Sequence, residues 1–234
     1  MGMGKQSAFI LALGFIISAV IFGEFFIFAR NEKSIRVVGQ GVKSVTSDVA
    51  KWNITISKDT TVENQNEGPK LIQKELLKVK KYLNNNAITD KDIFIEPITS
   101  FSNYGNNGVS GYSFSQKIEV RCNDIEKLEK LALDIDAMEK EEIYLQNSNI
   151  EYYISNLADL KAEMLALATV DAKARAQEIA NSSGNKICNL LSAKSGVFMI
   201  RKPLSTDVSD YGIYNTSSKE KEVAVTVTAT FKVK

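Results

Sequence analysis

Regular alternation of apolar and polar residues predicts several strands in this chain. Between residues 112 and 122 the even positions are mostly apolar and the odd positions are polar, which is the pattern of a strand with one buried face. Residues 223–233 repeat this alternation with valines on one side and threonines on the other, as is typical of an antiparallel sheet. Two more strands are expected at about 35–45 and 50–56, joined by a short turn into a hairpin.

Helical spacing of apolar residues predicts three helices between the strands. They cover about 70–83, starting or kinked at Pro69, then about 124–139, with Asn123 or Asp124 as the N-cap, and about 157–182. The third helix is expected to end near Gly184, and alanines every four residues give it a nearly flat face that could lie very close to a sheet or another helix. The order of these elements predicts an α+β fold, with mainly antiparallel sheets packed against about three helices.

The first thirty residues have a different character from the rest. Residues 7–28 are almost entirely apolar, and about 21 helical residues would span about 32 Å, which matches a bilayer hydrocarbon core of about 30 Å. We therefore expect one N-terminal transmembrane helix or signal anchor in residues 1–30, contacting the lipid bilayer through residues 7–28, followed by one domain in residues 31–234. A secretory signal peptide is the alternative, because Lys5 precedes the apolar run; Ile27, two residues before Ala29, makes a poor cleavage site, so we favour the anchor.

Composition excludes several kinds of chemistry. The 234 residues include no histidine, which excludes Ser-His-Asp and Cys-His catalytic units, the HExxH zinc helix and His-ligated haem. Two cysteines, Cys122 and Cys188, are too few for a four-thiolate zinc or iron–sulfur site, and either a disulfide or free thiols fit the sequence. The formal net charge of +1 argues against nucleic-acid binding. We expect no catalytic residue, metal or cofactor, although an enzyme using Ser, Asp or Lys stays an alternative.

Two charge runs of opposite sign are candidate interfaces. Residues 124–142 hold eight acidic side chains and three lysines, and the helix predicted at about 70–83 carries a lysine face. If these surfaces meet between protomers they would steer self-assembly, an effect that salt screens. The residues that we expect in such contacts are Lys74, Lys78, Glu139 and Glu142.

Two predicted loops are further candidates for contact with a partner. Residues 100–110 contain Phe101 and Tyr104, and residues 204–218 contain Tyr211 and Tyr214, all among Ser, Asn and Gly neighbours. Aromatic side chains in such surroundings are typical of adaptable contact surfaces. A flexible surface excursion is the alternative reading of both loops.

Several segments together resemble the SIMPL-domain family. They are Val37-Val38-Gly39-Gln40-Gly41, Ser47-Asp48-Val49-Ala50, Gly111-Tyr112, the run Asp171-Ala172-Lys173-Ala174-Arg175-Ala176, and the alternating C-terminal strand. Gly39-Gln40-Gly41 is one glycine short of a dinucleotide fingerprint and lies in a predicted strand, so we interpret its glycines as allowing a bulge or a close backbone approach. Gln40 and Ser47 depart from the family's usual residues, at a strand and its turn, and leave the expected fold unchanged.

The resemblance implies a bacterial envelope or secreted protein. In some members it implies a large ring-like homo-oligomer, in others an association with oxidative-stress tolerance, and it attaches no catalytic residues to the family. We therefore expect a non-enzymatic, homo-oligomeric protein, anchored by a single pass in the bacterial cytoplasmic membrane with its domain in the periplasm. A monomeric binding or adaptor module for another envelope protein, and secretion after cleavage, are the alternatives. Arg30, Lys33 and Arg36 follow the apolar run, and by the positive-inside rule they would instead place the domain in the cytoplasm.

Overall fold

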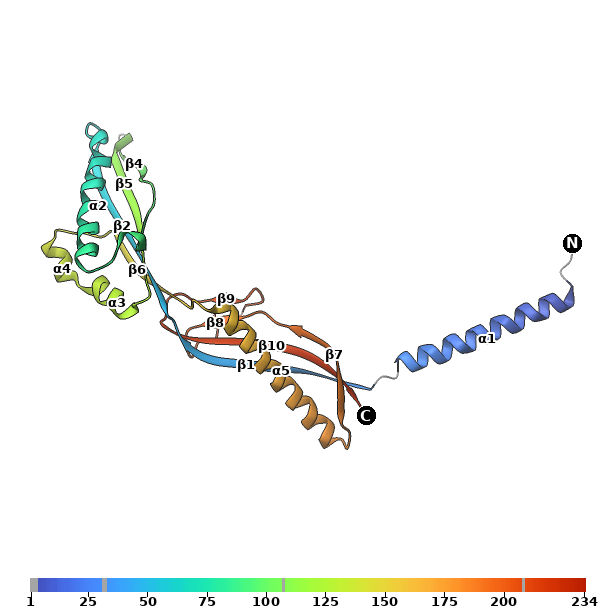
Figure 1. The fold of residues 1–234 in the computed structure, drawn as a ribbon. Helices are drawn as coiled ribbons and strands as arrows, with labels where there is room; N and C mark the ends of the chain where they lie inside the picture. The colour runs from blue at the N-terminus through green and yellow to red at the C-terminus, as the bar shows by residue number, and fades with distance from the viewer. Residues whose placement is uncertain (1–3, 31–32, 107, 208) are drawn as a thin grey trace. The chain divides into compact units, whose positions relative to one another are not determined.

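The computed structural model describes residues 4–30, 33–106, 108–207 and 209–234. The chain divides into two compact units, of which the first comprises residues 1–42, 162–198 and 224–234 and the second comprises residues 43–161 and 199–223 (Figure 1). The predicted boundary after residue 30 adjoins residues 31 and 32, which lie outside the described residues.

Helix α1 (Lys5–Arg30) belongs to the first unit, and its described side chains are those of residues 9–25. In the described part of the chain, no helix is both long enough and apolar enough to cross a membrane. The transmembrane helix therefore stays a prediction.

Besides α1, the first unit contains most of a second long helix and strands of one sheet. Strand β10 (Glu220–Val233) pairs with β1 (Ser34–Thr46) and, in antiparallel register, with β7 (Ile187–Ser195). In the second unit, β8 (Met199–Arg201) and β9 (Ile213–Tyr214) pair with each other in parallel.

Helix α5 (Leu157–Ser182) has the predicted bounds, and the alanines of its flat face are fully buried. A Cβ atom on Gly39 would lie 2.2 Å from the carbonyl oxygen of Ala168 and 2.3 Å from the backbone nitrogen of Ala172. The close approach that the alanine spacing predicts is thus confirmed, and it requires glycine in β1.

The second unit contains an antiparallel sheet with the strand order β3-β5-β2-β6, in which β4 also pairs with β5. The strands are β2 (Val49–Thr61), β3 (Ile93–Ile95), β4 (Thr99–Gly105), β5 (Gly108–Cys122) and β6 (Asn147–Tyr153). Helices α2 (Gly68–Asn85), α3 (Ile125–Leu133) and α4 (Ile135–Lys140) accompany them, with short 3₁₀ turns at Gln65–Glu67 and Asp90–Asp92. Pro69 occupies the first turn of α2, where its missing N–H costs no hydrogen bond.

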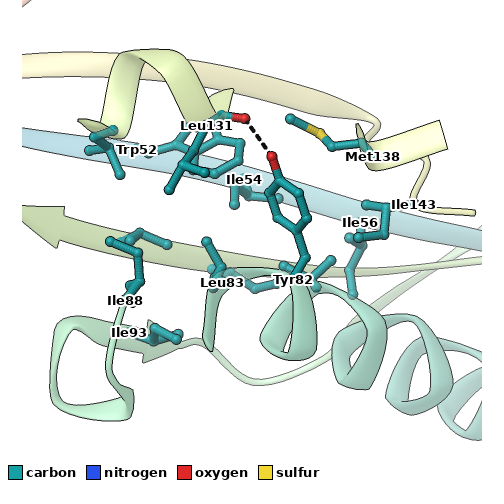
Figure 2. Close-up of a cluster of buried hydrophobic side chains, with 14 of the residues drawn as sticks. Trp52, Ile54, Ile56, Tyr82, Leu83, Ile88, Ile93, Leu131, Met138 and Ile143 are labelled. Atoms are coloured by element: carbon teal, nitrogen blue, oxygen red, sulfur yellow. Dashed lines mark hydrogen bonds between the residues drawn. The ribbon is translucent and has the colours of Figure 1, made fainter. Parts of the chain in front are cut away.

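The core of the second unit lies between one face of this sheet and the three helices (Figure 2). Trp52, Ile54 and Ile56 of β2 are buried there, as are Ile118 and Val120 of β5, in agreement with the predicted alternation. Tyr82 of α2 donates its hydroxyl to the carbonyl of Leu131 at 3.0 Å, which ties α2 to α3 inside the core. The α+β class with mainly antiparallel pairing is confirmed.

Three local predictions were wrong. Residues 35–45 and 50–56 lie in strands, as predicted, but these strands do not form a hairpin: β1 pairs with β10 in one sheet, and β2 pairs with β5 and β6 in the other. The single helix expected at about 124–139 is two helices, because Asp134 ends α3 and its carboxylate caps α4 by accepting a hydrogen bond from the backbone N–H of Ala137 at 3.0 Å. Of the two predicted caps, Asn123 and Asp124, it is Asp124 that caps α3, accepting a hydrogen bond from the backbone N–H of Lys127. The loop expected at 100–110 is largely strand β4 and the start of β5, paired as a hairpin. The described residues therefore form five α-helices instead of the predicted anchor and about three others.

Candidate functional site

The second unit presents one sheet face that α2, α3 and α4 leave open. The residues that alternate with the core residues along β2, β5 and β6 lie on this face, and apart from Gly111 none of them is buried. We call this surface the polar sheet face, defined by Lys51, Asn53, Thr55, Lys117, Glu119, Arg121, Asn147, Asn149 and Glu151.

Strand register arranges the polar sheet face in rows across the sheet. Lys51 lies opposite Arg121 on one side and Glu151 on the other, and Asn53 likewise lies between Glu119 and Asn149. A third row consists of Asn147, Thr55 and Lys117. Directly opposed side chains on neighbouring strands are close enough to interact, so each row forms a continuous polar track.

Opposite charges on this face neutralise one another. The Lys51 ammonium lies 2.9 Å from the Glu151 carboxylate and 3.9 Å from that of Glu119, which also pairs with Arg121 at 3.5 Å. The hydrogen bond with Glu151 raises the pKa of Lys51, and the same bond lowers the pKa of Glu151. The pKa of Tyr153 is raised by burial and by the hydrogen bond that its hydroxyl donates to Glu151 at 2.9 Å.

Two hollows follow the rows. One, of about 260 Å³, is lined mainly by polar side chains, among them Asn53, Glu119 and Asn149, and it also reaches Glu96 between β3 and β4. The other, of about 330 Å³, is lined by Val49, Lys51, Arg121 and Tyr153. Aromatic rings accompany the second hollow: Tyr153, which lines it, stacks on Tyr214, and the Phe94 ring centre lies 4.4 Å from the guanidinium of Arg121, another lining residue. Sequence alternation indicates the β5 side of this face, but β6 has no such alternation, so we did not predict the site.

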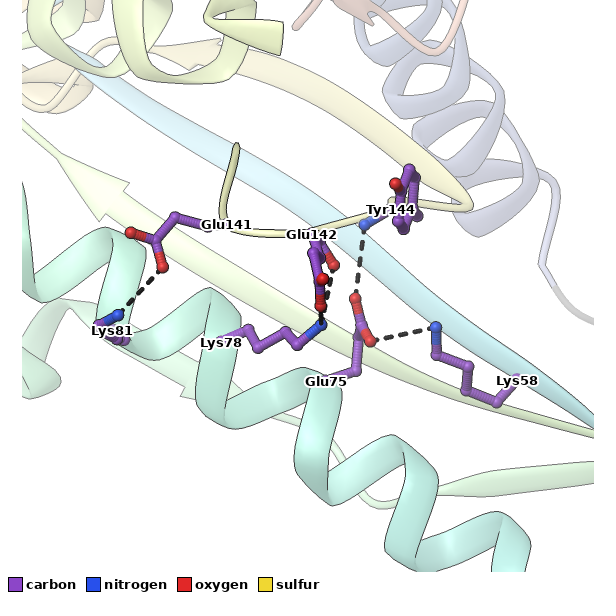
Figure 3. Close-up of polar contacts among 7 residues, drawn as sticks. All are labelled: Lys58, Glu75, Lys78, Lys81, Glu141, Glu142 and Tyr144. Carbon is purple, nitrogen blue, oxygen red and sulfur yellow. Dashed lines mark hydrogen bonds and ion pairs between the residues drawn. The ribbon is translucent and has the colours of Figure 1, made fainter. Parts of the chain in front are cut away.

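Of the residues predicted for contacts through charge, Lys78 and Glu142 meet within one chain. Their side chains lie 3.0 Å apart, and Lys81 pairs similarly with Glu141 at 3.1 Å (Figure 3). Lys74 and Glu139 are exposed. Contacts between protomers through these four predicted residues stay a prediction.

Close to these pairs lies a buried carboxylate that we did not predict. Glu75 accepts the backbone N–H of Tyr144 at 3.4 Å and pairs with Lys58 at 3.1 Å (Figure 3). Its side chain is 5% exposed, so the pair links α2, β2 and the segment before β6. The available signal was its position, three residues after Ile72 and four before Val79 on the apolar side of the predicted helix.

The predicted aromatic residues are in different environments. Phe101 and Tyr104 are exposed on β4, and Tyr211 is 98% exposed. Tyr214 instead borders the polar sheet face, where its hydroxyl accepts the backbone N–H of Ile154 at 3.3 Å and its ring stacks on Tyr153. Of the four, Tyr214 is therefore the one that the described residues show in contact beside the polar sheet face.

A separate hollow of about 350 Å³ has mainly apolar walls. We call it the apolar groove, lined by Ala132, Ile135, Met138, Glu139, Ile143, Tyr144, Leu145 and Ser148. Ile135 is 71% exposed, and the neighbouring Leu133 is exposed as well. Apolar side chains left open in one place are typical of an interaction surface.

The two cysteines and the acidic side chains are the remaining groups that could react or bind a metal. Cys122 is half-buried and Cys188 is exposed, and both thiols are free. Within the part of the chain that the structure describes, no group of three or more Cys, Asp or Glu side chains is placed to hold a metal ion.

The sequence matches the family described as "SIMPL: Protein of unknown function (DUF541)" over residues 35–231. The chain belongs to the SIMPL family. No curated protein matches this SIMPL chain.

Solved structures resemble this SIMPL protein only weakly. The crystal structure of AtUAH in complex with glyoxylate is 14% identical with a TM-score of 0.24, and the match covers 50% of this chain and 30% of that chain. An uncharacterized conserved protein from Listeria innocua is 9% identical with a TM-score of 0.24, covering 80% of this chain and 92% of that one. The de novo designed protein Foldit4 is 16% identical with a TM-score of 0.20, covering 47% and 93% respectively. Similarities this weak support no inference about function.

Proposed function

We propose that this SIMPL-domain protein is a membrane-anchored, non-enzymatic binding protein of the bacterial envelope, whose polar sheet face is its recognition surface. One observation carries the proposal: three rows of polar side chains cross neighbouring strands on a face that the helices of the same unit leave open. The two hollows along these rows give a ligand concave places to contact.

A membrane anchor is supported by the composition of α1. Residues 9–25 are apolar except Ser18 and Glu24, so apolar side chains occur on every side of the helix. A helix of this kind is normally buried in a protein core or in lipid. Placement of the remaining chain outside the cytoplasm rests on the family resemblance, whereas the positive charges after the apolar run favour the opposite orientation.

Cys188 provides a direct test of that orientation, because its thiol is free and exposed. A membrane-impermeant maleimide should label the full-length protein in intact cells, and Cys188→Ser should remove the label. Labelling that appears only after the cells are lysed would place the domain in the cytoplasm.

A binding role without catalysis is supported by the side chains themselves. The chain has no histidine, and the charges of the polar sheet face pair with one another. Burial lowers the pKa of Lys221, which would suit a nucleophile, yet its ammonium donates to the carbonyls of Asn215 at 2.6 Å and Ser218 at 2.8 Å. These contacts indicate that Lys221 fixes the loop before β10.

Site-specific photo-crosslinking tests recognition at the polar sheet face. A benzophenone side chain replaces Asn53 or Asn149 in the full-length, membrane-embedded protein, and Ser113, farther along β5 on the same face, is the matched control position. Adducts are expected at 53 and 149 and not at 113. Equal adducts at all three positions, or none, would contradict the proposal.

A second candidate function is assembly into a homo-oligomer, with the apolar groove as the interface. Exposed Leu133 and Ile135 favour it, because burial of such side chains against a second copy would be stabilising. Phe101, Tyr104 and Tyr211 are exposed and are further candidate contact residues for such an assembly.

A further inference from the structure

We infer that the polar sheet face binds an uncharged, β-linked glycan chain that lies across its strands. This inference rests on the proposed function and specifies the class of ligand. Four properties of the face lead to it: its charge balance, its hydrogen-bonding groups, the spacing of its rows and its exposed aromatic ring.

Charge balance makes a highly charged ligand unsuitable. The face and its hollow contain three cations, Lys51, Lys117 and Arg121, and three carboxylates, those of Glu96, Glu119 and Glu151. A polyanion would meet the carboxylates, and a polycation would meet the ammonium and guanidinium groups. An uncharged ligand avoids both repulsions and leaves the ion pairs of Lys51 with Glu151 and Glu119 intact.

Hydrogen-bonding capacity favours a ligand rich in hydroxyl groups. Asn53, Asn147, Asn149 and Thr55 line the 260 Å³ hollow, and each offers both donors and acceptors. A sugar hydroxyl also donates and accepts, so it can bond to an amide group and to a neighbouring carboxylate at once. The carboxylates of Glu96 and Glu119 in the same hollow accept the stronger, charge-assisted hydrogen bonds.

The spacing of the rows suits an extended chain of sugar rings. Asn149, Asn53, Glu119 and Phe94 occupy successive strands β6, β2, β5 and β3 in one row. Neighbouring strands lie about 4.8 Å apart, and a β-linked pyranose chain advances by a similar length with each ring. Consecutive rings would therefore meet consecutive side chains of the row. An α-linked glucan curls and cannot keep this register.

Phe94 supplies the apolar surface that one side of a sugar ring needs. Its side chain is 45% exposed at the end of the row, and the Arg121 guanidinium beside it holds the ring in place. A peptide strand fits less well, because extended peptides pair with strand edges through their backbone and need pockets for alternate side chains. The row lies on the face of the sheet, and its hollow is lined mainly by polar groups.

Isothermal titration calorimetry on the full-length protein tests the inference, in a detergent without sugar headgroups. Cellohexaose and chitohexaose are the β-linked probes, maltohexaose is the α-linked control of equal length, and polymannuronate, which is β-1,4-linked and anionic, is the charged control. Saturable binding of a β-linked probe is expected, with at least tenfold weaker binding of maltohexaose and polymannuronate.

Variants locate the binding. Asn149→Ala and Phe94→Ala change exposed side chains and should each weaken binding of the β-linked probe about tenfold, a loss of about 1.4 kcal/mol. Ser113→Ala, on the same strand face but outside the row, should bind as the unaltered protein does. Thermal unfolding of each variant verifies that the fold is kept.

Three outcomes would overturn the inference: no binding of either β-linked probe, equal binding of maltohexaose, or unchanged binding by both row variants. Photo-crosslinks at residues 53 and 149 would show whether the proposed recognition surface survives such a result. Crosslinks without glycan binding would refute the inference that the ligand is a glycan but would support the polar sheet face as a recognition surface. A peptide would then be the ligand to test next. Absence of both would refute the inference and the proposed function together.

Discussion

At the residue scale, the contact between β1 and α5 depends on Gly39 having no side chain. The Cβ atom introduced by Gly39→Ala would meet backbone atoms of Ala168 and Ala172 at 2.2 and 2.3 Å, and backbone cannot swing away as a flexible side chain can. We expect the free energy of unfolding, measured with urea, to fall by about 3 kcal/mol or more. Gly105→Ala is the control, because its Cβ would lie 3.3 Å from the nearest atom, Ser110 Cβ. Equal stability of the two variants would contradict the close packing.

Two ion pairs have the same distance, 3.1 Å, but differ in how deeply they are buried. Lys58→Ala would remove the cation from the buried Glu75 carboxylate and leave it the hydrogen bond from the Tyr144 N–H, at an expected cost of about 2 kcal/mol. Lys81→Ala breaks the pair with Glu141, whose partners are 64% and 38% exposed, and should cost less than about 0.5 kcal/mol. Chemical denaturation of both variants measures the difference. A larger loss for Lys81→Ala would show that burial is not the deciding factor.

The Lys51 and Glu151 pair makes stability depend on pH in a defined direction. The pKa of Glu151 is lowered by Lys51 in the folded state, so its stabilising contribution is present above the unfolded-state pKa and is lost as pH falls through the folded value. We expect stability to decrease as pH falls below about 5, and Glu151→Gln to reduce the steepness of that decrease. Lys51→Met removes the same interaction from the other side and should reduce it similarly. An unchanged pH profile in both variants would contradict a coupling between them.

At the scale of secondary-structure elements, Asp134 divides α3 from α4. Asp134→Ala removes the hydrogen bond from its carboxylate to the Ala137 N–H and should destabilise the protein by about 1 kcal/mol. Asp124→Ala, which removes the cap of α3, should have a similar effect. Asp136→Ala, in the first turn of α4, serves as the control and should cost less. Stability unchanged by Asp134→Ala would show that the break between the helices has another cause.

The same elements show which features a sequence can predict. Helix α5 and strands β5 and β10 bury one regular face, so their periodicity is strong and their positions agree with the prediction. Strand β4 is almost entirely exposed, so its sequence shows no alternation of buried and exposed residues. Asp134 lies within a helical pattern, where an aspartate can be either a surface residue or a cap. The polar sheet face depends on register between strands nearly 100 residues apart, such as Asn53 opposite Asn149. Local patterns carry no information about such pairing.

At the scale of the whole molecule, the choice between a monomeric binding protein and an assembly depends on which surfaces stay open. Lys78 and Glu142, expected to attract another copy, are bonded within one chain and have less to offer a partner. The apolar groove retains exposed Ile135, and Leu133, two residues before it in the sequence, is exposed as well. If copies associate, we therefore expect apolar burial to drive it more than charge.

Light scattering after size exclusion, on the full-length protein in detergent, tests this expectation. A discrete species of several protomers should persist from about 50 mM to about 1 M salt, because apolar contacts are not screened as charge pairs are. Ile135→Glu should reduce it to a monomer by placing a charge in the interface. Leu77→Glu should not, although Leu77 is also exposed, because it lies on α2 outside the apolar groove. Dissociation at high salt would instead favour contacts through Lys74 and Glu139. A monomer under all conditions would contradict assembly and leave binding at the polar sheet face as the function to test.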